Sequence, residues 1–111
     1  MADHDLASLG DSYVNFVDSL VVSDRAGKPA GTKVKGSVLA EALRRAGLRE
    51  FLPSRMSKHA LADAAESLIV YAWLEGRISL EESIAIVEKE KDLVAGLSRL
   101  LSIAKDRITF P

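Results

Sequence analysis

The chain has 111 residues, of which 48% are hydrophobic and 28% are charged, and its formal net charge is −1. This length fits a single domain over residues 1–111, and the balance of apolar and charged residues excludes a disordered chain. The sequence has no cysteine and no apolar run long enough to cross a membrane. We therefore expect neither disulfides nor a membrane span, and we expect a cytoplasmic protein.

The charges are unevenly distributed along the chain. The net charge is −4 over residues 1–27, +6 over residues 28–59 and −3 over residues 60–111. A basic middle between two acidic ends is a candidate surface for nucleic-acid phosphates, and a mixed-charge surface without a ligand is the alternative.

The first predicted element is a helix over about residues 5–22. Its apolar residues follow helical spacing at Leu6, Leu9, Tyr13, Phe16 and Leu20. The opposite stripe of this segment is polar. Residues 23–36 contain three Gly and one Pro, which predicts a loop. A second helix is then expected, with Ser37 as its N-cap and Gly47 at its C-terminal end.

Further helices are predicted in the second half of the chain. Residues 54–75 are expected to form a long helix that Gly76 ends, because residues 60–74 contain neither Gly nor Pro. Ser79 and Glu82 have the spacing of a capping box, which predicts a fourth helix that continues to about Gly96. A fifth helix covers about residues 97–106, unless Gly96 lies inside one long helix. No strand pattern is present, although residues 107–110 could be extended.

Two acidic residues lie in the most apolar of these helices. Asp63 and Glu66 are three residues apart, which places them side by side on one helix face. Burying two adjacent carboxylates needs compensation from a metal ion, from solvent in a cleft or from a basic side chain. A wetted stripe or pairing with Arg or Lys therefore remains an alternative to a metal site.

Asp11 raises the same question in the first helix. It follows Gly10, and a glycine inside a helix costs about 1 kcal/mol relative to alanine. Such a cost suggests that another helix approaches closely at Gly10, which would bring Asp11 to a packed junction. The alternative is a surface aspartate.

The three acids offer oxygen ligands of the kind that Mg²⁺ or Mn²⁺ prefers. The two histidines, His4 and His59, are more simply explained as surface residues than as ligands. No P-loop, nucleotide-binding glycine motif or Ser-His-Asp arrangement is present.

Three stretches resemble motifs of the ribonuclease III family, in the family's order. Residues 6–12 (LASLGDS) resemble the signature LEFLGDS/A, and residues 61–69 (LADAAESLI) resemble the second motif LADxxEALI. Residues 36–48 resemble the helix that links them. The resemblance covers about residues 4–76 and is closest to short archaeal ribonuclease III-like proteins without a double-stranded-RNA-binding domain.

The resemblance implies an all-α, ribonuclease III-like endonuclease domain of about five helices that acts as a homodimer on double-stranded or structured RNA. It implies that Asp11, Asp63 and Glu66 are catalytic residues that bind Mg²⁺ or Mn²⁺. The basic segment supplies candidate RNA contacts, which are Lys33, Lys35, Arg44, Arg45 and Arg55.

The chain also departs from the family pattern at the signature motif. Ala7 stands where the family has a metal-binding glutamate, and Ser8 stands where it has an aromatic residue at the dimer seam. Three functions therefore compete: a metal-dependent endoribonuclease, a catalytically impaired RNA-binding or assembly module, and a helical protein-interaction domain. The last would use the apolar residues between positions 93 and 103 as its interface.

Overall fold

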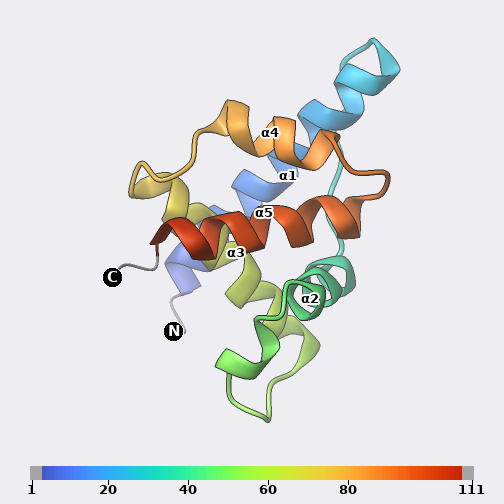
Figure 1. Ribbon diagram of the computed structural model, residues 1–111. Helices are drawn as coiled ribbons and strands as arrows, with labels where there is room; N and C mark the ends of the chain where they lie inside the picture. Colours follow the sequence, from blue (N-terminus) through green and yellow to red (C-terminus); the bar gives the residue numbers. More distant parts are fainter. Residues whose placement is uncertain (1–3, 109–111) are drawn as a thin grey trace.

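The computed structural model describes residues 4–108, and this range is helical without a strand (Figure 1). The helices are α1 (His4–Ala26), α2 (Gly36–Arg45), α3 (Lys58–Leu74), α4 (Leu80–Glu88) and α5 (Leu93–Ile108), with a 3-10 turn, η1 (Arg49–Phe51), between α2 and α3. The predicted all-α class with about five helices is confirmed.

Helix α3 lies at the centre of the molecule, and α1, α2 and α5 all pack against it (Figure 1). Its apolar residues are buried on several sides, as expected for a helix that is apolar nearly all round. The buried residues of α3 are Leu61, Ala62, Ala65, Glu66, Ser67, Ile69, Val70 and Ala72. Glu66 is therefore a core residue with an ionisable side chain.

Helices α1 and α3 approach each other closely at Gly10. A Cβ atom added there would overlap the backbone carbonyl of Glu66 and lie 2.9 Å from the Cβ of Glu66. The close approach predicted from the sequence is confirmed. It also shows why only glycine fits at this position, directly before Asp11.

Helix α1 is longer than predicted, and the loop after it is ordered by α1 itself. The helix continues to Ala26 and ends at Gly27, which has a φ of +72°. The chain then runs back along α1. Ser23 Oγ accepts a hydrogen bond from the N–H of Ala30 at 2.8 Å, and Asn15 Oδ1 accepts one from the N–H of Val34 at 2.7 Å. The polar stripe of α1 thus holds the returning loop.

Three predicted boundaries of the later helices are wrong: the start of the third helix, the end of the fourth and the start of the fifth. Helix α3 begins at Lys58 with Ser57 as its N-cap, because Arg49 donates to the carbonyls of Pro53 and Ser54 and holds that segment in a loop. The fourth helix ends at Glu88 instead of near Gly96. Helix α5 begins at Leu93, and the side chain of Asp92 accepts a hydrogen bond from Ala95 N.

Gly96 lies inside α5 because it packs against α4. A Cβ atom at this position would come within 2.9 Å of the carbonyl oxygen of Val87. The extended conformation considered for residues 107–110 is wrong for residues 107 and 108, which are helical. Residues 109 and 110 lie outside the described range.

The other predicted helix ends agree with the structure to within a residue or two. Ser79 and Glu82 form both hydrogen bonds of the capping box, and Gly47 follows α2 with a φ of +75°. Helix α2 begins at Gly36, with Lys35 in place of Ser37 as the N-cap residue. Within residues 4–108, no helix is both long and apolar enough to cross a lipid bilayer.

Candidate functional site

The three predicted site residues line one pocket at the crossing of α1 and α3. The pocket has a volume of about 340 Å³. Asp11 comes from α1, while Asp63 and Glu66 come from successive turns of α3. The other residues around this pocket, which we call the acidic pocket, are His4, Ala7, Ser8, Lys33 and His59. Because Gly10 lets the two helices touch, side chains more than 50 positions apart share one small space.

Glu66 is the most deeply buried of the three acids. It is only 5% exposed. Burial raises its pKa to about 8, and a hydrogen bond with Asp11 and the negative charges of Asp11 and Asp63 act in the same direction. Around neutral pH the Glu66 carboxyl therefore keeps its proton in the metal-free protein and donates it to Asp11.

Asp11 is the charged member of this pair. The hydrogen bond from Glu66 lowers the pKa of Asp11, burial opposes this shift, and Lys33 strengthens it. The Nζ atom of Lys33 lies 3.4 Å from Asp11 Oδ2. The aspartate thus receives a proton-mediated contact from α3 and an ammonium contact from the loop that follows α1.

Asp63 is the acid of the acidic pocket that neighbours His59, and 29% of its side chain is exposed. His59 stands one helical turn before it, and their Nε2 and Oδ2 atoms are 3.6 Å apart. Both side chains also line a neighbouring hollow that contains Arg55 and Met56. The acidic pocket and this hollow are therefore neighbours that share lining residues along the first half of α3.

The donor chemistry of the acidic pocket fits a hard divalent cation, since three carboxyl groups converge on it from two helices. In the side-chain conformations found here, however, no group of three or more His, Asp or Glu residues within positions 4–108 is arranged to hold a metal ion. Asp11 is directed to Lys33 and Asp63 to His59. Asp11 is also hydrogen-bonded to Glu66, so these two acids already lie together, while Asp63 contacts His59.

The departure from the signature motif falls on the wall of this pocket. Ala7 is 6% exposed and lines the pocket one helical turn before Asp11. A carboxylate at this position would project among the other three acids, so the pocket has one fewer ligand than the motif would provide. Ser8 also lines the pocket.

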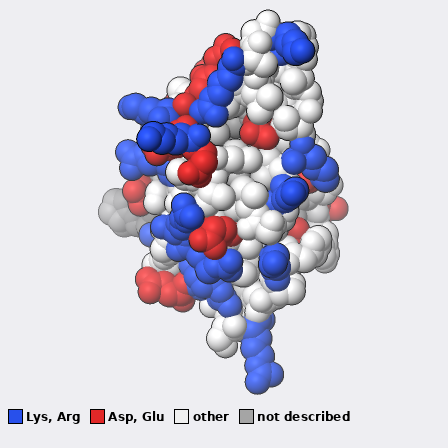
Figure 2. All heavy atoms as spheres, turned by 90° about the vertical axis from the view of Figure 1, so that its right-hand side faces the viewer, with Lys and Arg blue, Asp and Glu red and all other residues white. Residues whose placement is uncertain are grey.

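The five candidate RNA contacts are not gathered in one place. Lys33 lies in the acidic pocket and Arg55 in the hollow next to it. Arg44 and Arg45 instead bind Glu41 on their own helix, at 3.1 Å and 3.3 Å. Lys35 is exposed at the start of α2. Figure 2 shows Lys and Arg interspersed with Asp and Glu over one face of the molecule, without a continuous basic surface in that view.

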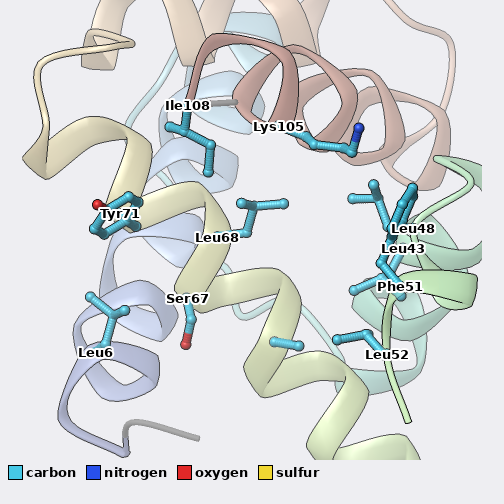
Figure 3. Close-up of a pocket in the computed structure, with 11 residues that line it drawn as sticks. Leu6, Leu43, Leu48, Phe51, Leu52, Ser67, Leu68, Tyr71, Lys105 and Ile108 are labelled. Atoms are coloured by element: carbon cyan, nitrogen blue, oxygen red, sulfur yellow. The ribbon is translucent and has the colours of Figure 1, made fainter. Parts of the chain in front are cut away.

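A second hollow, on another side of α3, is apolar. It has a volume of about 400 Å³, and Leu68 projects into its middle (Figure 3). Tyr71 and Ile108 stand at one end, and Phe51 and Leu52 at the other. No carboxylate lines it. This hollow offers no ligands for a hydrolytic metal.

The apolar residues between positions 93 and 103 belong to the core. Leu97, Leu100 and Leu101 are fully buried, and their neighbours Leu93, Val94 and Ile103 pack against them. They do not form the free surface that the protein-interaction hypothesis required.

Sequence reasoning missed the two side chains that contact the acids. Lys33 was considered only as an RNA contact, and His59 only as a surface residue. The position of His59 four residues before Asp63 on one helix was a usable signal. The Lys33 contact depends on how a glycine-rich loop folds back, for which sequence periodicity gives no signal.

Two comparisons with known proteins bear on the family of this chain. A protein-family model described as ribonuclease III matches residues 4–107. A comparison with curated proteins gave no match.

Proposed function

Because the chain belongs to the ribonuclease III family, we propose that it is a metal-dependent endoribonuclease that hydrolyses phosphodiester bonds of double-stranded or structured RNA. It would act in the cytoplasm as a homodimer of single-domain subunits, with Mg²⁺ or Mn²⁺ as its cofactor. Asp11, Asp63 and Glu66 are the proposed catalytic and metal-binding residues.

The shared pocket of these three acids is the observation that supports the proposal most. Grouping three acids beside a glycine that permits close helix contact, with Glu66 buried, is unfavourable for stability alone, because like charges repel and a buried carboxyl loses its hydration. Such an arrangement is typical of sites where the charges are needed for binding or chemistry.

Each part of the pocket has a distinct proposed role. A divalent ion, when bound, activates a water molecule and neutralises charge on the phosphate. Asp11 and Asp63 would hold the ion from opposite helices, and Glu66 would join them after losing its proton. Lys33 and Arg55 lie at the rim of the pocket and its neighbouring hollow, where they can contact RNA phosphates.

A catalytically impaired RNA-binding or assembly module is the second candidate. Ala7 favours it, because the pocket lacks the carboxylate that the signature motif would place there. In this case the protein would bind RNA without metal and without turnover.

Cleavage of a duplex RNA in the presence of Mg²⁺ or Mn²⁺ tests the proposal. We expect cleavage by the wild-type protein and a loss of at least about 100-fold with Asp63→Asn, because the variant keeps the shape of the side chain but removes a ligand charge. Asp106→Asn is the matched control, since Asp106 is exposed on α5 and does not line the acidic pocket.

Three outcomes separate the candidates. Cleavage that depends on Asp63 but not on Asp106 supports the endoribonuclease. RNA binding without cleavage supports the impaired module. Absence of both RNA binding and RNA cleavage at low salt contradicts the endoribonuclease and the impaired module alike.

A further inference from the structure

The loop between α1 and α2 carries its lysine to a defined place on the acidic pocket. Successive polar residues of α1 bind the returning chain: Ser19 Oγ accepts from Thr32 N at 2.9 Å, and Thr32 Oγ1 donates to Asp18 Oδ2 at 2.6 Å. Asn15 then binds Val34. Lys33 lies between these two anchored residues, so its reach toward Asp11 follows from a fixed backbone.

Lys33 supplies positive charge to a pocket that has an excess of acids. The ammonium contacts Asp11, and its charge also acts on Glu66. The Lys33 side chain is nevertheless 74% exposed. An ion pair this exposed is weak, so the lysine can leave the aspartate at small cost when a stronger cation arrives.

We propose that Lys33 is a built-in counter-cation of the acidic pocket, which holds Asp11 in the metal-free protein and is displaced from it by the divalent ion. The proposal rests on the metal-dependent function proposed above. It is consistent with a pocket in which three acids meet without forming a group that holds an ion, and in which Asp11 contacts the lysine as well as Glu66.

The displacement has a consequence for the order of binding. Once the divalent ion occupies Asp11, the Lys33 ammonium loses its carboxylate partner and remains at the rim of the pocket. An RNA phosphate is then the available anion. Metal binding and RNA binding therefore assist each other through this one side chain.

The test is the affinity of the metal-free protein for Mn²⁺ at low ionic strength, measured from the electron paramagnetic resonance signal of free Mn²⁺. We expect Lys33→Met to bind Mn²⁺ about threefold to tenfold more tightly than the wild type, because it removes both a competing contact and a repelling charge. Lys33→Arg keeps the charge and should bind as the wild type does.

Lys28→Met is the matched control. Lys28 is exposed in the same loop, and it does not line the acidic pocket. Removing its charge should change the Mn²⁺ affinity by less than twofold. Both positions are exposed, so the three variants should fold, which circular dichroism checks.

A second measurement uses RNA binding in the presence of Ca²⁺, which occupies oxygen sites. Lys33→Met should bind duplex RNA severalfold more weakly than the wild type while it binds the metal more tightly. These opposite changes distinguish displacement from a purely structural role of the lysine.

The outcomes also separate this proposal from the one on which it rests. Equal or weaker Mn²⁺ affinity of Lys33→Met overturns the counter-cation role alone. Absence of Mn²⁺ binding by both the wild type and Lys33→Met overturns the metal site, and the counter-cation role with it.

Discussion

Glu66 combines burial with two acidic neighbours, and this makes the stability of the metal-free protein depend on pH. Its pKa is about 8 in the folded protein and near the ordinary 4.5 in the unfolded chain. Between these values the folded state holds more protons than the unfolded state, so the free energy of unfolding falls as the pH rises. The contribution of Glu66 to the free energy of unfolding is therefore fully present below pH 4.5 and is lost as the pH rises through about 8.

Glu66→Gln should remove this dependence. The amide cannot ionise, so the variant should gain stability relative to the wild type by at most about 1.4 kcal/mol per pH unit between pH 5 and 8. Urea unfolding in the presence of a chelator measures it. A wild-type stability that rises over this range in parallel with Glu66→Gln would contradict the assignment of the proton to Glu66.

Ala7 is the residue at which activity can be gained instead of lost. Ala7→Glu would place a fourth carboxyl group in the acidic pocket. We expect Mn²⁺ affinity to increase about tenfold, since affinity follows the number of charged ligands, and RNA cleavage to increase with it. In the presence of a chelator the variant should unfold more easily, because the added charge is close to the other acids. Unchanged Mn²⁺ affinity would show that position 7 does not reach the ion.

Among the elements, the contact between α1 and α3 fixes the geometry of the pocket. Gly10→Ala would drive a Cβ atom into the carbonyl of Glu66. We expect a loss of about 1–3 kcal/mol in the free energy of unfolding, as for other overpacked sites, even though alanine favours a helix by about 1 kcal/mol. Chemical denaturation measures the loss.

Gly36→Ala is the control for this substitution. Gly36 also lies in a helix, but a Cβ atom there would meet only the Cβ of Ala62 at an ordinary distance of 3.6 Å. Its stability should stay equal to the wild type or rise. Equal effects of the two substitutions would mean that helix propensity, and not the α1–α3 contact, determines the result.

The same elements show which parts of the structure the sequence could predict. Gly10 was predictable because a glycine that weakens a helix needs a compensating contact, and Ser79 because its cap pairs with Glu82 within one turn. Such signals are local. The start of α3 was not predictable in this way, because Arg49 holds the carbonyls of Pro53 and Ser54 and so delays the helix.

The acidic pocket was predictable only in part for the same reason. The motif spacing indicated which acids come together, and the structure places them in one pocket. The pairing of Asp11 with Lys33 depends on a loop held by side chain–backbone hydrogen bonds across 13 to 19 positions. Periodicity does not encode such partners.

For the whole molecule, the charge distribution determines how RNA could be held. The basic segment 28–59 is divided by the fold: Arg55 faces the hollow beside the acidic pocket, whereas Arg44 and Arg45 are largely occupied with Glu41. Binding through phosphates releases counterions, so the logarithm of the affinity should fall linearly with the logarithm of salt concentration. The slope then reports the total number of phosphate contacts, and the change in slope on removing one side chain reports the contacts that this side chain makes.

Arg55→Ala should therefore reduce the magnitude of this slope by about one for duplex RNA in a chelator, where no cleavage takes place. Arg44→Ala should reduce it by less than about half of that, because Glu41 already pairs with Arg44 and neutralises part of its charge. Fluorescence anisotropy at a series of salt concentrations measures both slopes. A larger effect of Arg44 than of Arg55 would place the RNA interface at the end of α2 and not at the acidic pocket. It would then contradict the proposal that the three carboxyl groups act on a phosphate of the bound RNA.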